Sequence, residues 1–180
     1  LVQSAGQGTT TLNGSLSTDL AAGVDLNGNA FTINGAVTTT NGGGVTITNS
    51  GTLTIGSSGD MTLDGAFSQD GSGSVSTAGD ITTTGDNISF NGAVTLTGAV
   101  SFSTGSGAGD VSFASTLDGS AGSEDLTITA GTGSVTFTGA VGSTATLGNV
   151  SASGGSVTVS STFAASGDIT FTSDSIDLNG

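Results

Sequence analysis

The side chains in this chain that could do chemistry are almost all carboxylates. Thirteen aspartates and the single Glu124 give 180 residues a formal charge of −14, and Lys, Arg, His, Cys, Pro, Trp and Tyr are absent. Carboxylate oxygens can ligate a hard cation such as Ca²⁺, or they can accept hydrogen bonds in turns. Four aspartates follow a glycine directly before an apolar stretch and are the candidate calcium ligands: Asp60, Asp80, Asp110 and Asp168.

The same Gly-Asp pairs also form turns without any metal, and this is the interpretation we favour. On it the chain requires no cofactor, and calcium remains the alternative. Adding a chelator during thermal melting distinguishes the two.

The missing residue types exclude most other functions. Without Lys and Arg the chain cannot neutralise phosphates, so we expect no nucleic-acid partner. Without His and Cys there is no ligand set for zinc, copper or haem, and a nucleophilic triad has no base. Glycoside hydrolysis needs two carboxylates that flank one bond, and the aspartates show no such pairing in the sequence. We therefore predict that the protein is not an enzyme. No apolar run approaches the roughly 20 residues that a membrane span needs, so we expect no membrane insertion.

Short apolar–hydroxyl–apolar triplets recur along the whole chain. An alternation with a period of two residues, rich in β-branched side chains, is typical of half-buried strands. Val, Ile, Leu and Phe should then point inward while Thr and Ser face solvent. The clearest triplets are 45–47, 53–55, 61–63, 94–96, 126–128, 135–137, 157–159 and 169–171.

Turn-forming pairs separate these triplets. Examples of Asn-Gly are at Asn13, Asn27, Asn34, Asn91 and Asn179, and Asp-Gly occurs at Asp64 and Asp118. Such residues accept positive φ or bond their own backbone, so they bend the chain sharply. Glycine also recurs in nearly every block of ten residues, which argues against helix.

The spacing of the strands predicts the architecture. Starts are expected at Val37, Val45, Leu53, Met61, Val75, Ile81, Ile88, Val94 and Val100, which leaves only short turns between strands. Three strands and three corners make a coil of about 18–24 residues, and stacked coils form a repeat solenoid. We predict an all-β fold, a single-stranded parallel β-helix (β-solenoid) with Asn-Gly and Gly-Asp corners. It should have roughly eight to ten coils spaced about 4.8 Å apart. An antiparallel β-sandwich is the alternative, because Asn-Gly turns also suit hairpins.

Five phenylalanines end triplets of the form apolar–Ser/Thr–Phe. We expect them to occupy one equivalent place in the coil and to form a shared internal stack: Phe90, Phe102, Phe113, Phe137 and Phe171.

Three segments carry a family resemblance. Residues 126–153 read LTITAGTGSVTFTGAVGSTATLGNVSAS, and residues 79–119 and 8–28 are similar in style. They resemble the repeats of giant bacterial cell-surface proteins, the filamentous-haemagglutinin-like and autotransporter-like adhesins. The resemblance implies a secreted, extracellular protein whose right-handed β-helical rod projects from the cell surface as an adhesin stalk, sheath or filament.

We expect residues 1–180 to form one continuous solenoid. The sequence VDLNG at residues 24–28 returns as IDLNG at residues 176–180, as one period of a longer tandem array would require. The expected function is that of an acidic structural protein that associates end to end as a homopolymer. A surface or glycan receptor is also open, and the sequence does not identify it. Two alternatives stay open: an ice-binding protein with outward Thr rows, and a calcium-loaded adhesion module.

Overall fold

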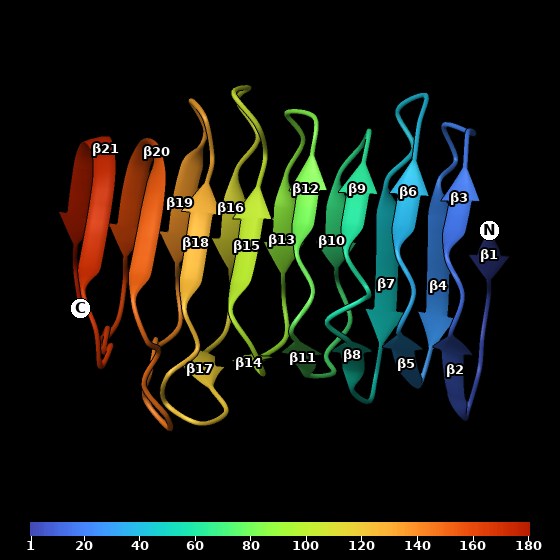
Figure 1. Cartoon of the computed structure of the whole chain (residues 1–180), viewed down its shortest axis with the longest axis horizontal. Helices are drawn as coiled ribbons and strands as arrows, with labels where there is room; N and C mark the ends of the chain where they lie inside the picture. Colours follow the sequence, from blue (N-terminus) through green and yellow to red (C-terminus); the bar gives the residue numbers. More distant parts are fainter.

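The computed structural model describes residues 1–180 as a solenoid of about eight coils, with no helix. Each of the first six coils contributes one short strand to each of three faces, and the coils stack along the long axis (Figure 1). In the last coils the second face continues only as isolated bridges, Leu117↔Val141 and Val141↔Phe163. Every paired strand is parallel to its neighbour, as in Val24↔Val45 and Phe67↔Ile88. The predicted parallel β-solenoid is therefore confirmed, and the alternative of an antiparallel sandwich is wrong.

The strands of the three faces follow one another in sequence order. The first face contains β1 (Val2–Gln3), β4 (Val24–Gly28), β7 (Val45–Asn49), β10 (Phe67–Gln69), β13 (Ile88–Phe90), β16 (Val111–Phe113) and β19 (Ser134–Phe137). The second face contains β2 (Thr9–Leu12), β5 (Ala30–Ile33), β8 (Leu53–Ile55), β11 (Val75–Thr77), β14 (Val94–Leu96) and β17 (Leu117–Gly119). The third face contains β3 (Leu16–Thr18), β6 (Val37–Thr39), β9 (Met61–Leu63), β12 (Ile81–Thr83), β15 (Val100–Ser103) and β18 (Leu126–Thr129).

Two longer strands form the C-terminal end of the rod. β20 (Val150–Val159) and β21 (Ile169–Leu178) each run from the third face across the corner onto the first face (Figure 1). The N-terminal half of β20 pairs with β18 and its C-terminal half with β19, so the first and third faces belong to one sheet. All nine predicted strand starts, from Val37 to Val100, coincide with strand starts in the structure.

Coil length varies with the corner loops. On the first face, partners in successive coils lie between 19 residues apart (Val157↔Ile176) and 24 residues apart (Val111↔Val135). One coil exceeds the predicted range: Val100 pairs with Leu126, because residues 120–125 form an additional loop between β17 and β18.

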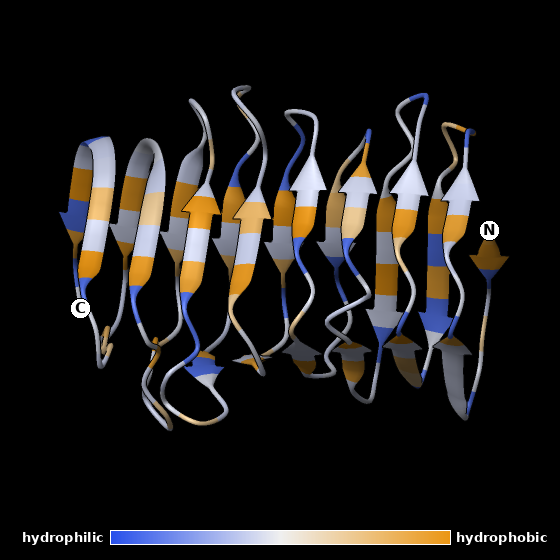
Figure 2. Ribbon diagram, viewed as in Figure 1, coloured by the Kyte–Doolittle hydropathy of each residue, from blue (hydrophilic) through white to orange (hydrophobic).

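The interior is a continuous column of 34 buried apolar side chains. Inward positions alternate with outward Thr and Ser in almost every strand, which Figure 2 shows as orange hydrophobic bands separated by near-white ones. Phe90, Phe113 and Phe137 stack in register, with ring centroids 5.3 and 5.5 Å apart and planes 7° and 4° apart.

The expected common position of the five phenylalanines is only partly right. Phe102 lies on the third face opposite Ile81, and Phe171 lies in β21 opposite Ala152. The shared internal stack nevertheless exists, because Phe102 contacts both Phe90 and Phe113 across the interior at centroid distances of 5.2 and 5.9 Å.

The corners are also bonded from coil to coil. Of 100 backbone hydrogen bonds, 48 lie outside the regular strand ladders, so the turns stack as well as the strands. One Asn-Gly pair turns as predicted, because Asn41 and Gly42 both have positive φ (56° and 78°). Other pairs act differently: no further Asn has positive φ, and Asn27-Gly28 and Asp118-Gly119 lie within strands. Asn34 instead donates a side-chain hydrogen bond to Asn13 in the preceding coil at 2.9 Å.

Candidate functional site

The four candidate calcium ligands occupy two different corners. Asp60, Asp80 and Asp168 precede strands of the third face, whereas Asp110 precedes a strand of the first face. Asp60 and Asp80 are neighbours in adjacent coils, and Asp168 lies several coils further along the rod. No group of three or more carboxylates is close enough to hold one metal ion jointly.

The carboxylates at these corners accept hydrogen bonds from the next coil. Asp60 Oδ1 accepts the backbone N–H of Asp80 at 2.9 Å, and Asp80 Oδ1 accepts that of Ser101 at 2.7 Å. Asp110 Oδ1 accepts the N–H of Ser134 at 2.7 Å. A charged acceptor makes such bonds stronger than a neutral one. These three aspartates therefore join adjacent coils, which differs from the turn-forming role favoured above. Asp168 instead donates its backbone N–H to Asn149 Oδ1 at 3.0 Å.

We expect EDTA to leave the midpoint of thermal unfolding unchanged. One carboxylate oxygen of each of Asp60, Asp80 and Asp110 already accepts a backbone N–H, so we expect these corners to hold without a bound cation. The measurement is a thermal melt in dialysed buffer with EDTA, compared with one in millimolar CaCl₂. A midpoint several degrees higher in calcium would contradict this expectation and support specific calcium sites.

Asp64 joins three successive coils. Its carboxylate accepts the backbone N–H of Gly42 at 2.8 Å and the hydroxyl of Thr84 at 3.0 Å. These two hydrogen bonds, first that of Gly42, hold the pKa of Asp64 below its ordinary value. Asp64 therefore also links adjacent coils by hydrogen bonds, at the corner between the third and first faces.

Glu124 is a buried carboxylate that the sequence pattern did not single out. It is 7% exposed and folds back into the loop of residues 120–125. Its Oε1 accepts the Ser120 hydroxyl (2.8 Å) and the Ala121 N–H (2.9 Å), and its Oε2 accepts the Ser123 N–H (3.1 Å). Burial acts to raise the pKa of Glu124, but these hydrogen bonds outweigh it and the pKa lies below the ordinary value. The one available signal was that this is the single Glu among thirteen Asp.

Replacing Glu124 with glutamine should destabilise the protein by about 1–2 kcal/mol at neutral pH, because an amide cannot accept all three hydrogen bonds. The folded pKa is depressed, so the stabilisation is present above the ordinary value of 4.5 and is lost as pH falls through the folded pKa. Urea denaturation at several pH values should therefore show the gap between wild type and E124Q closing below pH 4.5.

The matched control is Asp86→Asn, which removes the same charge from an exposed side chain that makes no hydrogen bond. Its difference from wild type should stay small at every pH. If the difference in unfolding free energy between wild type and E124Q is the same at every pH, the charge of Glu124 does not contribute to stability.

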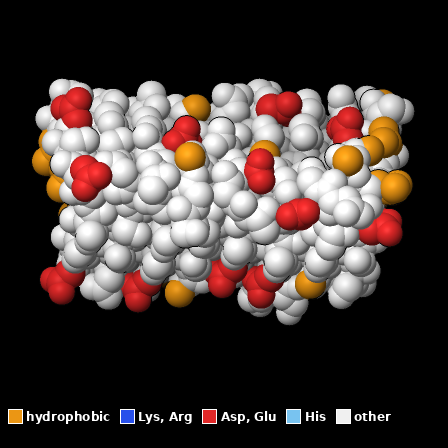
Figure 3. Space-filling model, turned by 90° about the horizontal axis from the view of Figure 1, so that it is seen from above, with side chains coloured by type: hydrophobic (Ala, Val, Ile, Leu, Met, Phe, Trp, Pro, Cys, Tyr) orange, Lys and Arg blue, Asp and Glu red, His pale blue; other side chains and the backbone are white.

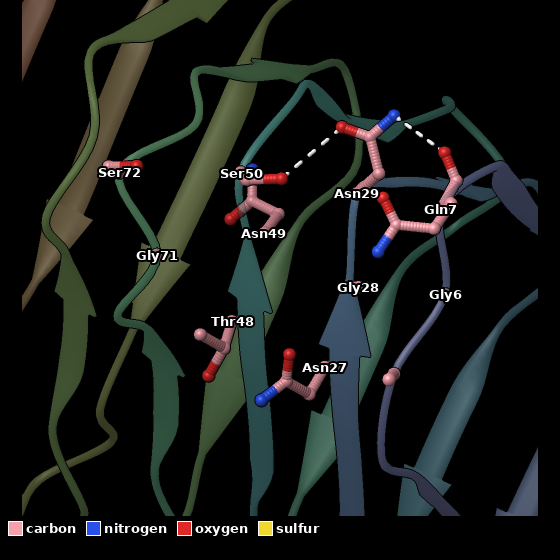
Figure 4. Close-up of a pocket in the computed structure, with 11 residues that line it drawn as sticks. Gly6, Gln7, Asn27, Gly28, Asn29, Thr48, Asn49, Ser50, Gly71 and Ser72 are labelled. Carbon is pink, nitrogen blue, oxygen red and sulfur yellow. Dashed lines mark hydrogen bonds between the residues drawn. The ribbon is translucent and has the colours of Figure 1, made fainter.

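A polar depression of about 380 Å³ lies at the corner between the first and second faces (Figure 4). Asn29 donates to the Gln7 carbonyl at 3.1 Å and accepts from the Ser50 hydroxyl at 3.3 Å. The eleven residues that line the depression include no carboxylate and no aromatic ring. They are Ala5, Gly6, Gln7, Asn27, Gly28, Asn29, Thr48, Asn49, Ser50, Gly71 and Ser72. The site can hydrogen-bond a neutral polar group, and it contains no paired acid and base.

Outward hydroxyls line all three faces. The Thr-x-Thr pairs are divided among the first face (46/48 and 136/138), the second (52/54 and 95/97) and the third (82/84, 127/129 and 170/172). A regular two-column array exists only on the third face, over four consecutive coils. Its members are Ser101/Ser103, Thr127/Thr129, Ser151/Ser153 and Thr170/Thr172.

No protein-family model matches the chain, and comparison with curated proteins and with solved structures also gives no match. What the geometry establishes is a β-repeat solenoid. The finer resemblance to bacterial adhesins stays a prediction. The structure contains no helix that is long and apolar enough to span a membrane.

Proposed function

We propose that this chain is a structural extracellular protein, a stiff rod that serves as stalk, sheath or filament at a bacterial surface and associates end to end. The observation that carries the proposal is continuity along the rod, because one sheet of the first and third faces and one apolar core run along it. Apolar columns and corner hydrogen bonds continue from coil to coil, and no buried side-chain polar atom lacks a partner. Such a body gains stiffness from its own backbone pairing.

The surface suits a mechanical role in a solvent-exposed setting. Asp and Glu are scattered over the face in Figure 3 with no cation among them, and the chain has no Lys or Arg at all. A large net charge favours solubility of the rod. Trypsin-like proteases find no cleavage site, which fits a fibre outside the cell. Because the polar depression holds no acid–base pair, we also propose that the protein is not an enzyme.

Negative-stain electron microscopy of the purified chain, and of native material, tests this proposal. We expect filaments of constant width whose lengths vary. Isolated globular particles at every concentration would count against a filament, and a rod that stays single would leave only the stalk role.

Ice binding is the second candidate, and the two-column array on the third face is the observation that favours it. Neighbouring strands lie about 4.8 Å apart, so the array presents a flat, regular set of hydroxyl groups. Thermal hysteresis of the purified protein is the test. Freezing without hysteresis and without altered crystal shape eliminates this candidate.

A further inference from the structure

A second polar depression, of about 340 Å³, lies on the first face near its corner with the second face. It adjoins the depression of Figure 4, because both follow one outward column along the rod. Asn27 and Thr48 line the depression of Figure 4, and Asp70 and Asn91, in the next two coils, line the second one. The Thr48 hydroxyl donates a hydrogen bond to the Asp70 carboxylate between them. The two depressions therefore form an elongated polar site that runs parallel to the rod axis.

The sequence explains why the second depression is there. Coil after coil, the neighbouring outward column of the first face consists of Thr46, Ser68, Ser89, Ser112 and Thr136. Serine lacks the methyl group of threonine, so the three serines leave a trough between the two threonines. Ala114, which follows Asn91 in the other column, has a small side chain and widens this serine trough.

We propose that the serine trough and the depression of Figure 4 together bind a neutral polysaccharide chain that lies along the rod. Successive coils then contact successive parts of the sugar chain at intervals of about 4.8 Å. The inference rests on the proposed function, because it specifies the partner that a rod at a cell surface holds and the surface that holds it.

The side chains around the serine trough suit sugar hydroxyl groups. Asp70 is exposed, and only its Oδ1 accepts a hydrogen bond, so its Oδ2 can accept one from a sugar. Asn91 uses its amide nitrogen to bond Gly71, and its Oδ1 makes no hydrogen bond within the protein. The Ser112 hydroxyl also makes none and lines the trough. Hydroxyl and amide groups both donate and accept, as a polyhydroxylated ligand requires.

Charge and topology exclude the other polymers. The chain carries −14 and has no Lys or Arg, so a sulfated or uronic-acid polysaccharide would be repelled, as would a nucleic acid. A peptide strand finds no free sheet edge here, because β10, β13 and β16 are each paired on both sides. The exposed side chains around the trough are polar or alanine, and they offer no apolar pocket to anchor a peptide side chain.

Isothermal titration calorimetry of the full chain with cellohexaose, maltohexaose and N-acetylated chitohexaose tests the inference. We expect at least one of these neutral hexasaccharides to bind, and to bind more tightly than its own trisaccharide because the site is elongated. Oligogalacturonate of the same length is the acidic control and should not bind. On binding, the backbone amide NMR signals of Ser89, Asn91 and Ser112 should shift, and those of the second-face strands should not.

Ser89→Thr is the decisive variant, because it fills the trough with one methyl group and keeps the hydroxyl. One extra carbon in a fitted site costs about tenfold or more in affinity, and S89T should lose at least that much. Ser76→Thr is the matched control: Ser76 is an equally half-buried outward serine of the second face, between Thr54 and Thr95. S76T should bind like wild type. Threonine suits a strand at both positions, and circular dichroism melts check that both variants fold.

Three results would overturn the inference. The first is that no neutral hexasaccharide binds, and the second is that oligogalacturonate binds as tightly as they do. The third is equal affinity of S89T and S76T, because the sugar would then bind away from the trough. None of these results affects filaments seen in the electron microscope, so the proposed function would stand. Globular particles that still bind the sugar at Ser89 would contradict the filament and leave the sugar site intact.

Discussion

Phe113→Ala should lower the free energy of unfolding by about 4 kcal/mol, the largest loss that we expect from a single side chain. Phe113 is 1% exposed and stacks between Phe90 and Phe137 at centroid distances of 5.3 and 5.5 Å. It also contacts Phe102 from the opposite face at 5.9 Å. Truncation removes the apolar contacts and leaves a cavity, because the rings above and below are held in register by their own strands.

Urea denaturation measures this loss, with Ser112→Ala as the control on the outward side of the same strand. The control should change stability by less than about 0.5 kcal/mol. In a solenoid each coil contacts only its neighbours, so hydrogen exchange should speed up most in the coils on either side of β16. A loss below about 1 kcal/mol for F113A would mean that the ring stack is not what holds these coils together.

Gln69→Leu should cost about 3 kcal/mol, although leucine is more apolar and of similar volume. Gln69 is 1% exposed and lies inside the corner between the first and second faces. Its amide donates to Asn49 Oδ1 at 2.7 Å and to the Gly71 and Gly73 carbonyls at 2.9 and 3.3 Å. Its oxygen accepts the N–H of Gly92 at 2.9 Å.

Leucine would leave several of these groups buried without a partner, at about 1–3 kcal/mol each, and its own apolar contacts offset part of that cost. Gln7→Leu is the matched control, because Gln7 is exposed and its side chain makes no hydrogen bond. Equal unfolding free energies for Q69L and Q7L, measured in urea, would show that the buried amide is not required.

The strands and the coil length could be predicted from the sequence, because both depend on local patterns. The alternation of 45–47 or 61–63 identifies an inward and an outward side, and short turns leave only a coil of about three strands. The assignment of a triplet to a face depends on the length of every preceding corner. This is why Phe102 was expected beside Phe90 in one column and instead reaches it from another face.

The corner chemistry was predicted less well for the same reason. The aspartates were expected to bend their own turns, yet Asp80 and Asp110 bond the backbone of the next coil, 21 and 24 residues further on. Such bonds depend on the vertical alignment of corners, which no local pattern encodes. The burial of Gln69 inside the coil and of Glu124 in its loop likewise runs against the apolar rule. It is explained only by the carbonyl and N–H groups that surround them.

On the proposed function, the rods extend along their own axis by adding coil to coil. X-ray diffraction from aligned filaments of the wild-type chain distinguishes this arrangement from side-by-side association. Because strands run across the axis and coils stack about 4.8 Å apart, we predict a strong reflection near 4.8 Å on the meridian, parallel to the filament. A 4.8 Å reflection on the equator would mean that the rods lie across the filament and associate side by side, and it would rule out extension of the rods along their own axis.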